Sequence, residues 1–436
     1  MSNAEIGLLS IAGIVVLIQS GMHVAVALGL LSFVSVWAVK GDVETAGHLL
    51  FLSAQESIAS YAFGVIPLFT LMGLLVSVSG IADETFELAN RAFGRIRGGL
   101  GIATVAANAA FAAVTGTSIA SASVFTKVAV PQMVQRGYTR RYAVGVVAGS
   151  SVLGMLIPPS FLMIIYGIIT ETSIGQLFTG GILPGLLLAG TYAGLTMLLA
   201  VLAPRFIFAD GKNALAAEHG SGRRAWILGL PVVALIVLVL GGIYGGIFTP
   251  TEAGGVGALG ALVLALTKRR LDAPRFRQVL RETGEITAAI SFLIITAHMY
   301  ARMLALSGLP GVIGGWIEGA GLGLYGFLAI YLLILLVMGM FLDSVSILLI
   351  MVPLVLPVVD LFGVSDVWFG VVNIVAVEIG LLTPPLGIAC FVVRANLAGS
   401  DVDLNDVFAG AIPFAVTMAL VLLALVAFPG IVTALI

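Results

Sequence analysis

Hydroxyl-bearing residues and a glycine interrupt the apolar segment 99–134 near its centre, at Thr115-Gly116-Thr117-Ser118. A second apolar segment, 322–359, is interrupted at Asp343-Ser344, with Ser346 close behind. A helix broken inside a bilayer leaves main-chain groups unsatisfied, and these survive only when they are buried in protein or line a wet cavity. Freed carbonyl oxygens suit Na⁺, and freed N–H groups at the start of a half-helix suit a carboxylate. Both interruptions therefore predict a site for Na⁺ and a small organic anion.

Each interruption also has a simpler interpretation. The first, Ala113–Ser121, has the composition of a small-residue face on which helices pack. Asp343 in the second is a carboxylate within an apolar run, where an unpaired charge costs at least about 2.5–3.5 kcal/mol, so such residues are usually functional. Asp343 could ligate Na⁺, take up a proton or cap the helix that follows it. The capping role is compatible with the other two.

Tandem prolines mark two further breaks, at Pro158-Pro159 and Pro384-Pro385. Because proline has no N–H group, the carbonyl four residues earlier loses its helical donor. The carbonyls freed in this way belong to four residues: Gly154, Met155, Gly380 and Leu381. Ser160 and Thr383 place a hydroxyl beside each break. A simple kink is the alternative, and the recurrence of the tandem pair favours a functional break.

The elements that position these residues are membrane helices. The chain has 436 residues, of which 60% are hydrophobic and only 10% are charged, whereas a soluble protein has about 25% charged residues. A span needs roughly 20 apolar residues. The expected spans are 5–20, 22–39, 62–80, 142–168, 181–204, 226–247, 253–267, 285–306, 367–393 and 410–430. Segments 47–60 and 83–96 are amphipathic and are expected on the membrane surface or as ordinary loop helices.

The charges of the loops orient the spans. Basic loops contain Arg91–Arg97, Arg136–Arg141, Arg205–Arg224 and Lys268–Arg281, whereas the alternate loops are acidic or neutral. By the positive-inside rule the basic loops are cytoplasmic. Segment 99–134 then enters and leaves from the cytoplasm, segment 322–359 does so from the outside, and the N-terminus is outside. The sequence therefore predicts two re-entrant hairpins of opposite orientation.

The two hairpins belong to an internal repeat. Gly154–Ser160 and Gly380–Leu386 share a Gly-x-Leu-x-Pro-Pro pattern at an offset of 226 residues. The same offset aligns Pro131 with Pro357, Thr117 with Asp343 and Ser118 with Ser344. Inverted repeats with broken helices are typical of secondary transporters, whose binding site lies where the breaks meet near the midplane.

Other polar residues in the apolar stretches are ambiguous. Asn108 and Asn373 either ligate or join helices, and Glu378 is interpreted as a neutral buried acid or a functional one. His298 and Arg302 share one helix face, and Arg302 is able to extend to the interface. The net charge of -2 gives no case for nucleic acid. The single cysteine, Cys390, excludes an internal disulfide, and no metal-ligand cluster, phosphate loop or nucleophile motif supports enzyme chemistry.

Several stretches together resemble one family. They are Val65–Gly73, Thr115–Ser121, Gly154–Ser160, Ile247–Gly254, Asp343 in its hairpin, and Gly380–Pro385. Over nearly the whole chain they look like the large membrane subunit of TRAP (tripartite ATP-independent periplasmic) transporters. The first tip has Thr-Gly-Thr-Ser where Ser-Gly-Ser-Ser is commoner in the family, which is a conservative difference that leaves ligation plausible.

The resemblance implies an all-α polytopic membrane protein of the ion transporter superfamily, with inverted repeats and two re-entrant helical hairpins. An elevator-type fold divides the chain into 1–98 (scaffold helices and surface arm), 99–204 (first hairpin and transport-domain half), 205–306 (cytoplasmic connector and scaffold helices) and 307–436 (second hairpin and transport-domain half). The implied Na⁺ ligands are Thr115, Gly116, Thr117, Ser118, Gly154, Asp343, Ser344, Ser346, Gly380 and Thr383. The implied substrate contacts are Thr117, Ser118, Ser160 and Asp343.

The same resemblance implies Na⁺-coupled symport of a small organic anion, mostly a carboxylate, across the bacterial or archaeal inner membrane. Na⁺ is the coupling ion and no other cofactor is expected. Two partners are implied: a small four-helix membrane subunit and a periplasmic substrate-binding protein. The alternatives are a stand-alone Na⁺- or H⁺-coupled carrier of the same superfamily, an intramembrane enzyme, and a scaffold protein without transport.

Overall fold

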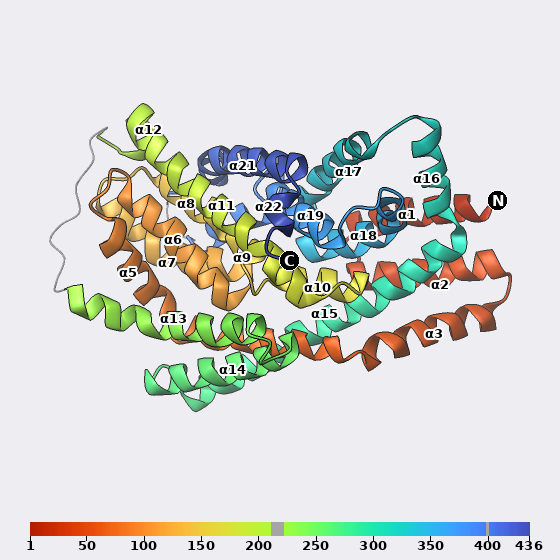
Figure 1. Ribbon diagram of the computed structural model, residues 1–436, viewed down its shortest axis with the longest axis horizontal. Helices are drawn as coiled ribbons and strands as arrows, with labels where there is room; N and C mark the ends of the chain where they lie inside the picture. Colours follow the sequence, from red (N-terminus) through yellow and green to blue (C-terminus); the bar gives the residue numbers. More distant parts are fainter. Residues whose placement is uncertain (211–221, 398–400) are drawn as a thin grey trace.

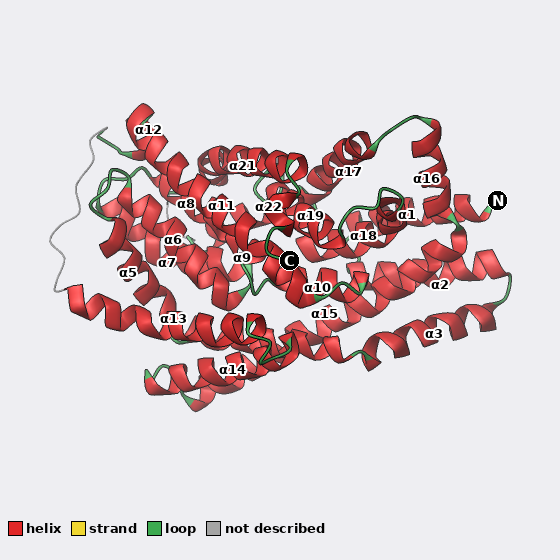
Figure 2. Cartoon of the chain, in the orientation of Figure 1, coloured by secondary structure: helices red, strands yellow, loops and turns green. Residues whose placement is uncertain are grey.

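The computed structural model describes residues 1–210, 222–397 and 401–436, and over these ranges the chain consists of helices and loops without a strand (Figures 1 and 2). Of the predicted connector, Lys212 and the side chains of Arg223 and Arg224 lie outside the described residues. Within these described ranges, six helical stretches are apolar and long enough to cross a bilayer: Tyr61–Val78, Arg140–Thr170, Ile174–Leu202, Pro250–Thr267, Ala273–Ser307 and Leu404–Ala427. The all-helical prediction is therefore confirmed for the described residues.

The first 98 residues form five α-helices and one short 3₁₀ helix. They are α1 (Asn3–Gln19), α2 (Val24–Lys40), α3 (Val43–Ala59), η1 (Tyr61–Gly64), α4 (Val65–Val78) and α5 (Ile81–Phe93). α3 begins where the Asp42 carboxylate accepts a hydrogen bond from the Thr45 N–H group at 2.8 Å, a common helix-start arrangement. The predicted amphipathic segments 47–60 and 83–96 are helical for most of their length.

The next segment contains the first hairpin and the first tandem proline. Its helices are α6 (Gly99–Thr115), α7 (Ser118–Gln135), α8 (Arg140–Ser151), α9 (Leu153–Leu156), α10 (Phe161–Thr170), α11 (Ile174–Leu202) and α12 (Pro204–Ile207). The predicted span 142–168 is thus interrupted at the prolines. Segment 99–134 is two helices joined at the predicted position.

Three long helices follow: α13 (Gly222–Tyr244), α14 (Pro250–Thr267) and α15 (Ala273–Ser307). α15 has 35 residues and begins well before the expected span 285–306. The first third of α15 is polar, so hydropathy alone does not predict it as part of the span. Asp272 caps this end of the helix by accepting a hydrogen bond from the Arg275 N–H group at 2.9 Å. α14 packs on α4 and α15 packs on α2.

The last segment repeats the order of the first hairpin and its broken helix. It contains α16 (Leu309–Gly319), α17 (Leu324–Gly339), α18 (Ser344–Asp360), α19 (Asp366–Gly380), α20 (Ile388–Ala395), α21 (Leu404–Ala427) and α22 (Gly430–Thr433). Thr117 and Asp343, which are 226 residues apart, precede the first residues of α7 and α18. Both Pro–Pro peptide bonds are cis. The internal repeat is therefore present in the order and the boundaries of the helices.

The two halves interlock through reciprocal contacts. α10, which follows the first break, packs against α18 of the second hairpin, and α20, which follows the second break, packs against α7 of the first. The Ser123 hydroxyl donates to the Asn396 side-chain oxygen at 3.0 Å on this second contact. Each hairpin is thus held by the broken helix of the other half as well as by its own.

The loops form two separate groups. Arg136 donates to Asn90 at 3.4 Å, Tyr138 pairs with Phe208, and Lys268 forms an ion pair with Glu84. These contacts bring several basic loops together at the open end of the first hairpin, where Tyr138 accepts from the Leu100 N–H group. In the other group, a cavity of about 410 Å³ is lined by the loops and adjoining helix ends at 60–62, 167–175 and 249–251. The open end of the second hairpin lies near that group, because Tyr166 donates to the Asp366 carbonyl at 2.9 Å. The hairpins therefore point in opposite directions, and their entry into a bilayer from opposite faces stays a prediction.

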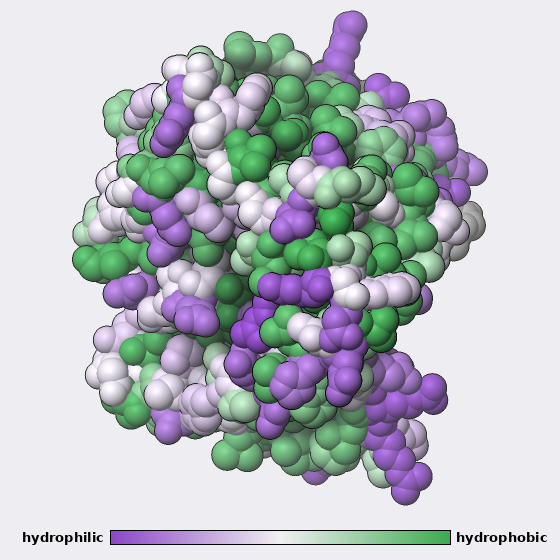
Figure 3. Space-filling model, turned by 90° about the vertical axis from the view of Figure 1, so that its right-hand side faces the viewer, coloured by the Kyte–Doolittle hydropathy of each residue, from purple (hydrophilic) through white to green (hydrophobic). Residues whose placement is uncertain are grey.

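Apolar side chains reach the surface over much of the molecule. Figure 3 shows hydrophobic residues exposed across one face, with hydrophilic residues gathered in patches. Leu8, Val16 and Phe51 are each more than half exposed, at 61%, 65% and 64%. Such continuous apolar surface is costly in water. It fits a chain whose solvent is lipid.

Candidate functional site

The first hairpin tip rests on the first tandem-proline break. α6 ends at Thr115, and Gly116 takes a left-handed conformation with φ of 66°. The Gly116 carbonyl accepts from the Phe161 N–H group at 3.1 Å, on the far side of the prolines. A Cβ atom on Gly116 would lie 2.6 Å from the Pro159 carbonyl oxygen. Glycine is therefore required both by the backbone conformation and by the close approach.

A second glycine makes the reciprocal contact. A Cβ atom on Gly154 would lie 2.6 Å from the Thr117 carbonyl oxygen. The Gly154 carbonyl has no backbone donor among the described residues, and the same holds for the carbonyls of Ala113, Val114 and Thr115 at the end of α6. Main-chain oxygens without donors are thus concentrated where the tip meets the break, as the sequence predicted.

The hydroxyl of Ser160 forms hydrogen bonds with two of the main-chain groups at the first proline break. It donates to the Met155 carbonyl and accepts from the Met163 N–H group at 3.4 Å, so that it caps α10. Ser160 is completely buried. The helical donor of Met155 is lost, as expected, but a side chain replaces it and only the Gly154 carbonyl stays open. Ser160 stays a predicted substrate contact, although its hydroxyl is engaged by the main chain in this structure.

The second tip, like the first, joins two helices beside a tandem-proline break, but it contains a carboxylate, Asp343. α17 ends at Gly339 and α18 begins at Ser344. Asp343 caps α18 by accepting from the Ser346 N–H group at 3.0 Å, and the Ser346 hydroxyl also donates to Asp343. A Cβ atom on Gly339 would lie 2.8 Å from the Gly380 Cα atom, so this tip also lies against its tandem-proline break.

The second break is more fully satisfied than expected. The Gly380 carbonyl accepts from the Thr383 N–H group at 3.0 Å, and the Thr383 hydroxyl donates to the Ile379 carbonyl at 2.8 Å. The expectation that Gly380 has a free carbonyl is wrong, because a tight turn replaces the missing helical donor. The Leu381 carbonyl has no backbone donor within the described parts of the chain, as expected.

The two tips meet at Glu378, whose position the sequence did not identify as central. Glu378 is completely buried. Its Oε1 atom accepts from the Ser344 hydroxyl at 2.7 Å, whereas Oε2 has no hydrogen-bond partner among the described residues. Ser118 of the first tip faces the same carboxyl group. Ser118 and Ser344 are the repeat-related serines, so one carboxyl group joins the first residues of α7 and α18.

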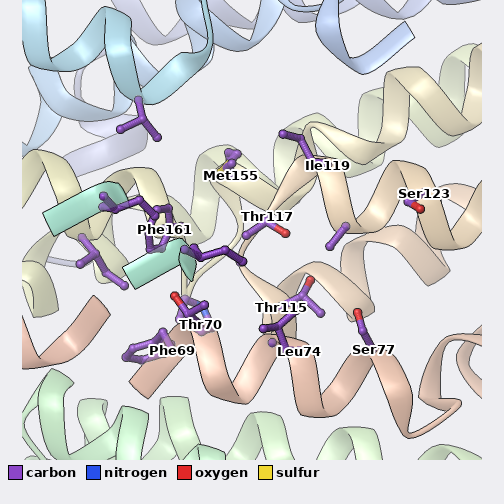
Figure 4. Close-up of a pocket in the computed structure, with 18 residues that line it drawn as sticks. Phe69, Thr70, Leu74, Ser77, Thr115, Thr117, Ile119, Ser123, Met155 and Phe161 are labelled. Atoms are coloured by element: carbon purple, nitrogen blue, oxygen red, sulfur yellow. The ribbon is translucent and has the colours of Figure 1, made fainter. Parts of the chain in front are cut away.

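A cavity of about 430 Å³ lies between the first tip and the helices α4 and α15. Figure 4 shows Thr117 near its centre, with Met155 and Phe161 on one side and Thr115, Leu74 and Ser77 on the other. Val345 from the second hairpin also lines it, so both hairpins contribute to one cavity. None of the described residues that line the cavity carries a charge. Its polar groups are mainly hydroxyls, from Thr70, Ser77, Thr115, Thr117 and Ser123.

Sequence reasoning missed the wall that α4 and α15 supply. Phe69, Thr70 and Ser77 come from α4, and Ile286 and Ile290 come from α15. Phe69 and Thr70 lie in the stretch Val65–Gly73 that carries the family resemblance, but that resemblance gave them no role, and nothing in the sequence sets Ser77, Ile286 or Ile290 apart from other residues of a span. Glu378 did carry a signal, since it is a second carboxylate in an apolar run, like Asp343.

Among the remaining ambiguous polar residues, Asn108, Asn373 and Arg302 join helices, whereas His298 contacts its own helix. Asn108 donates to the Ser150 hydroxyl at 2.6 Å, and Asn373 accepts from the Tyr331 hydroxyl. Arg302 forms an ion pair with Glu56 at 2.7 Å. His298 Nδ1 lies 3.0 Å from the Ile294 carbonyl of its own helix. The cavity is lined by none of these residues.

Sequence comparison relates this chain to known proteins. The family model of the DctM component of tripartite ATP-independent periplasmic transporters matches residues 11–431. The chain is 34% identical over 387 residues to the C4-dicarboxylate TRAP transporter large permease protein of Pseudomonas aeruginosa, covering 88% of each chain. It is 30% identical to the sialic acid TRAP transporter large permease protein of Vibrio cholerae, covering 85% of each, and 30% identical to the ectoine TRAP transporter large permease protein of Halomonas elongata, covering 92% and 91%.

The fold also has a solved counterpart. The crystal structure of the YdaH transporter of Alcanivorax borkumensis superposes with a TM-score of 0.65 and 14% identity, covering 88% of this chain and 89% of that one. At this identity the similarity concerns the fold alone. The match over residues 11–431 and the 34% identity over 387 residues show that this multi-pass membrane protein belongs to the family of large DctM permease components of the TRAP transporters.

Proposed function

We propose that this chain carries a small organic carboxylate across the inner membrane by Na⁺ symport. The observation that carries the proposal is the convergence of both hairpin tips on one site. Open carbonyls at Ala113–Thr115 and Gly154, together with the hydroxyls of the tips, supply the hard oxygen atoms that Na⁺ prefers. Na⁺ binding there leaves positive potential beside the cavity, where a carboxylate would bind.

The substrate class follows from the cavity and from the relatives. The cavity of about 430 Å³ has hydroxyl groups but no charged side chain among its described lining residues. An anion would therefore rely on bound Na⁺ and on the positive end of α7, whose first residue is Ser118. The relatives are named for a C4-dicarboxylate, sialic acid and ectoine, all of which contain a carboxylate. We infer a carboxylate of this size range for the present chain.

The membrane potential would assist such a symport. Each net positive charge that moves inward gains about 2.3 kcal/mol per 100 mV. The proposed Na⁺ ligands are distributed over both halves of the repeat, at Thr115–Ser118 with Gly154 and at Asp343–Ser346 with Thr383, whereas the occupied carbonyl removes Gly380 from the set. The two halves would then move together as a transport domain, 99–204 with 307–436, against a scaffold built from 1–98 and 205–306.

The partners are proposed from the family. TRAP transporters are tripartite, and the matched family is one of their components. The other two would be a small four-helix membrane subunit and a periplasmic binding protein that delivers the substrate. The exposed apolar side chains on α13 and α14, including Val233, Val237, Leu259 and Val263, offer surface to lipid or to the small subunit.

Reconstitution tests this proposal. The binding protein is first screened by thermal shift against a C4-dicarboxylate, sialic acid and ectoine. The large and small subunits are then placed in proteoliposomes, and uptake of the labelled ligand is measured with an inward Na⁺ gradient or an equal K⁺ gradient. The account predicts uptake that requires Na⁺, the binding protein and the small subunit. Equal uptake with K⁺ would remove Na⁺ from the mechanism, and uptake without the binding protein would favour a stand-alone carrier.

A further inference from the structure

Glu378 is the one completely buried glutamate or aspartate among the described residues. It lies on α19, two residues before Gly380 at the second break. Its Oε1 atom accepts from the Ser344 hydroxyl at 2.7 Å, and its Oε2 atom has no hydrogen-bond partner in the described part of the chain. A buried carboxyl oxygen without a partner is unusual, because burial removes the water that would otherwise bind it.

Among the described residues, the groups that interact with the Glu378 carboxyl group are hydroxyls. Ser118 and Ser344 face it from the two hairpins, and the Tyr192 hydroxyl of α11 interacts with it electrostatically. The Tyr192 hydroxyl is itself buried, and no described residue forms a hydrogen bond with it. No lysine, arginine or histidine of the described chain forms an ion pair with Glu378. A charged carboxylate in this place requires a bound cation.

We propose that Glu378 Oε2 is a ligand of a coupling cation that links the two hairpin tips, with Na⁺ as the ion. The inference rests on the proposed Na⁺ symport and adds a ligand that the repeat pattern alone does not supply, since the position equivalent to Glu378 in the first half is Val152. The cation is held by the carboxylate and by the hydroxyls of Ser118 and Ser344. Each hydroxyl belongs to the first residue of a different hairpin arm, so the ion fastens the two halves to each other.

This arrangement has a functional consequence. Without the cation, the carboxyl group is linked to the two tips only through neutral hydroxyls, with Ser344 at 2.7 Å and Ser118 facing it from the first tip. Such links are weaker than the attraction of both hydroxyl oxygens to one bound cation. With the cation bound, both tips share one charged centre, and the transport domain moves as a unit. A translocation step that requires this ion cannot occur when the site is empty, which prevents futile movement.

The test uses the purified full chain and two readouts. Glu378→Gln keeps the size and the acceptor for Ser344 but removes the charge. We expect the variant to unfold in K⁺ at the same temperature as the wild type and to lose most of the thermal stabilisation that Na⁺ gives. In proteoliposomes, the Na⁺ concentration for half-maximal uptake should rise about tenfold or more, and the Na⁺ dependence should become less steep.

Glu318→Gln is the matched control, because Glu318 on α16 is an exposed glutamate. It should leave both readouts unchanged. If Glu378→Gln does not fold, Glu378→Asp is used, which retains the charge but withdraws it by one methylene group, and the same weakening of Na⁺ binding is expected.

Three results would overturn the inference. Unchanged Na⁺ stabilisation and an unchanged Na⁺ midpoint in Glu378→Gln would show that the residue is a neutral structural acid, while the proposed symport stands. Unchanged Na⁺ behaviour in Glu378→Asp would do the same when the glutamine variant is unstable. Wild-type protein that shows neither Na⁺ stabilisation nor Na⁺-dependent uptake would defeat both the symport and this site.

Discussion

Alanine substitutions at Gly116 and at Gly41 distinguish the cost of a left-handed backbone conformation from the cost of losing the contact between the first tip and its proline break. Gly116 has a φ of 66° at the end of α6, and a Cβ atom would lie 2.6 Å from the Pro159 carbonyl oxygen. Gly41 has a φ of 74° at the end of α2, and a Cβ atom there would meet nothing within 4 Å. The two glycines therefore differ mainly in what surrounds them.

The magnitudes follow from these surroundings. A left-handed conformation costs a non-glycine residue about 1–2 kcal/mol at either position. At Gly116 the overlap must also be relieved, and the direct way is to move the tip away from Phe161. This movement breaks the hydrogen bond from the Phe161 N–H group, which is 3.1 Å long. Leaving such a buried group unpaired costs about 1–3 kcal/mol. Gly116→Ala should therefore destabilise the protein by about 2–5 kcal/mol, and Gly41→Ala by only about 1–2 kcal/mol.

The assay is thermal unfolding of both variants in detergent, followed by Na⁺-driven uptake in proteoliposomes. Gly116→Ala should show the larger drop in Tm and lose uptake at Na⁺ concentrations that saturate the wild type. Gly41→Ala should keep uptake, because the added Cβ atom meets nothing within 4 Å and so disturbs no neighbouring element. Equal Tm values for the two variants, with uptake retained in Gly116→Ala, would refute the idea that the tip needs its close contact with the break.

Three further predictions use other residues. Asp343→Asn should unfold in K⁺ at the same temperature as the wild type, because asparagine caps a helix about as well as aspartate. The Na⁺ concentration for half-maximal uptake should rise about tenfold. An unchanged Na⁺ concentration for half-maximal uptake would show that Asp343 only caps α18. Gly145→Ala should lower Tm strongly, because the new Cβ atom would lie 2.1 Å from the Gly410 carbonyl carbon on α21. Gly194→Ala in α11 is the control: its Cβ atom meets nothing within 4 Å, so the change should be neutral or stabilise the protein by about 1 kcal/mol. A larger drop in Tm for Gly194→Ala than for Gly145→Ala would contradict the close packing of α8 on α21. Arg302→Gln removes the ion pair with Glu56. It should change the free energy of unfolding by only about 0–1 kcal/mol, because both side chains are partly exposed, and uptake should persist. Loss of uptake with normal folding would show instead that Arg302 belongs to the transport path.

Local features of the site could be predicted from the sequence, because they depend on local chemistry. Glycine, hydroxyl residues and tandem prolines cannot continue a helix in lipid without other partners, so Thr115–Ser118, Asp343–Ser344 and both proline pairs mark real ends of helices. The offset of 226 residues correctly pairs Thr117 with Asp343 as the residues that precede α7 and α18.

Features that depend on distant contacts could not be predicted in the same way. The Gly380 carbonyl was expected to be open, but a local turn through the Thr383 N–H group occupies it. The convergence of Ser118 and Ser344 on Glu378 requires the two halves to be placed relative to each other. The α4 and α15 wall of the cavity is equally a product of tertiary packing. Periodicity and motif spacing carry no information about which helix faces which tip.

A density map of the complete transporter, obtained once in Na⁺ and once in K⁺, tests the central claim most directly. The account predicts ion density in Na⁺ at two places, between Thr115–Ser118 and Gly154 and beside Glu378 Oε2, and its loss in K⁺ together with loosening of the first tip. Identical maps in the two salts, with both places empty and the tips unchanged, would contradict it.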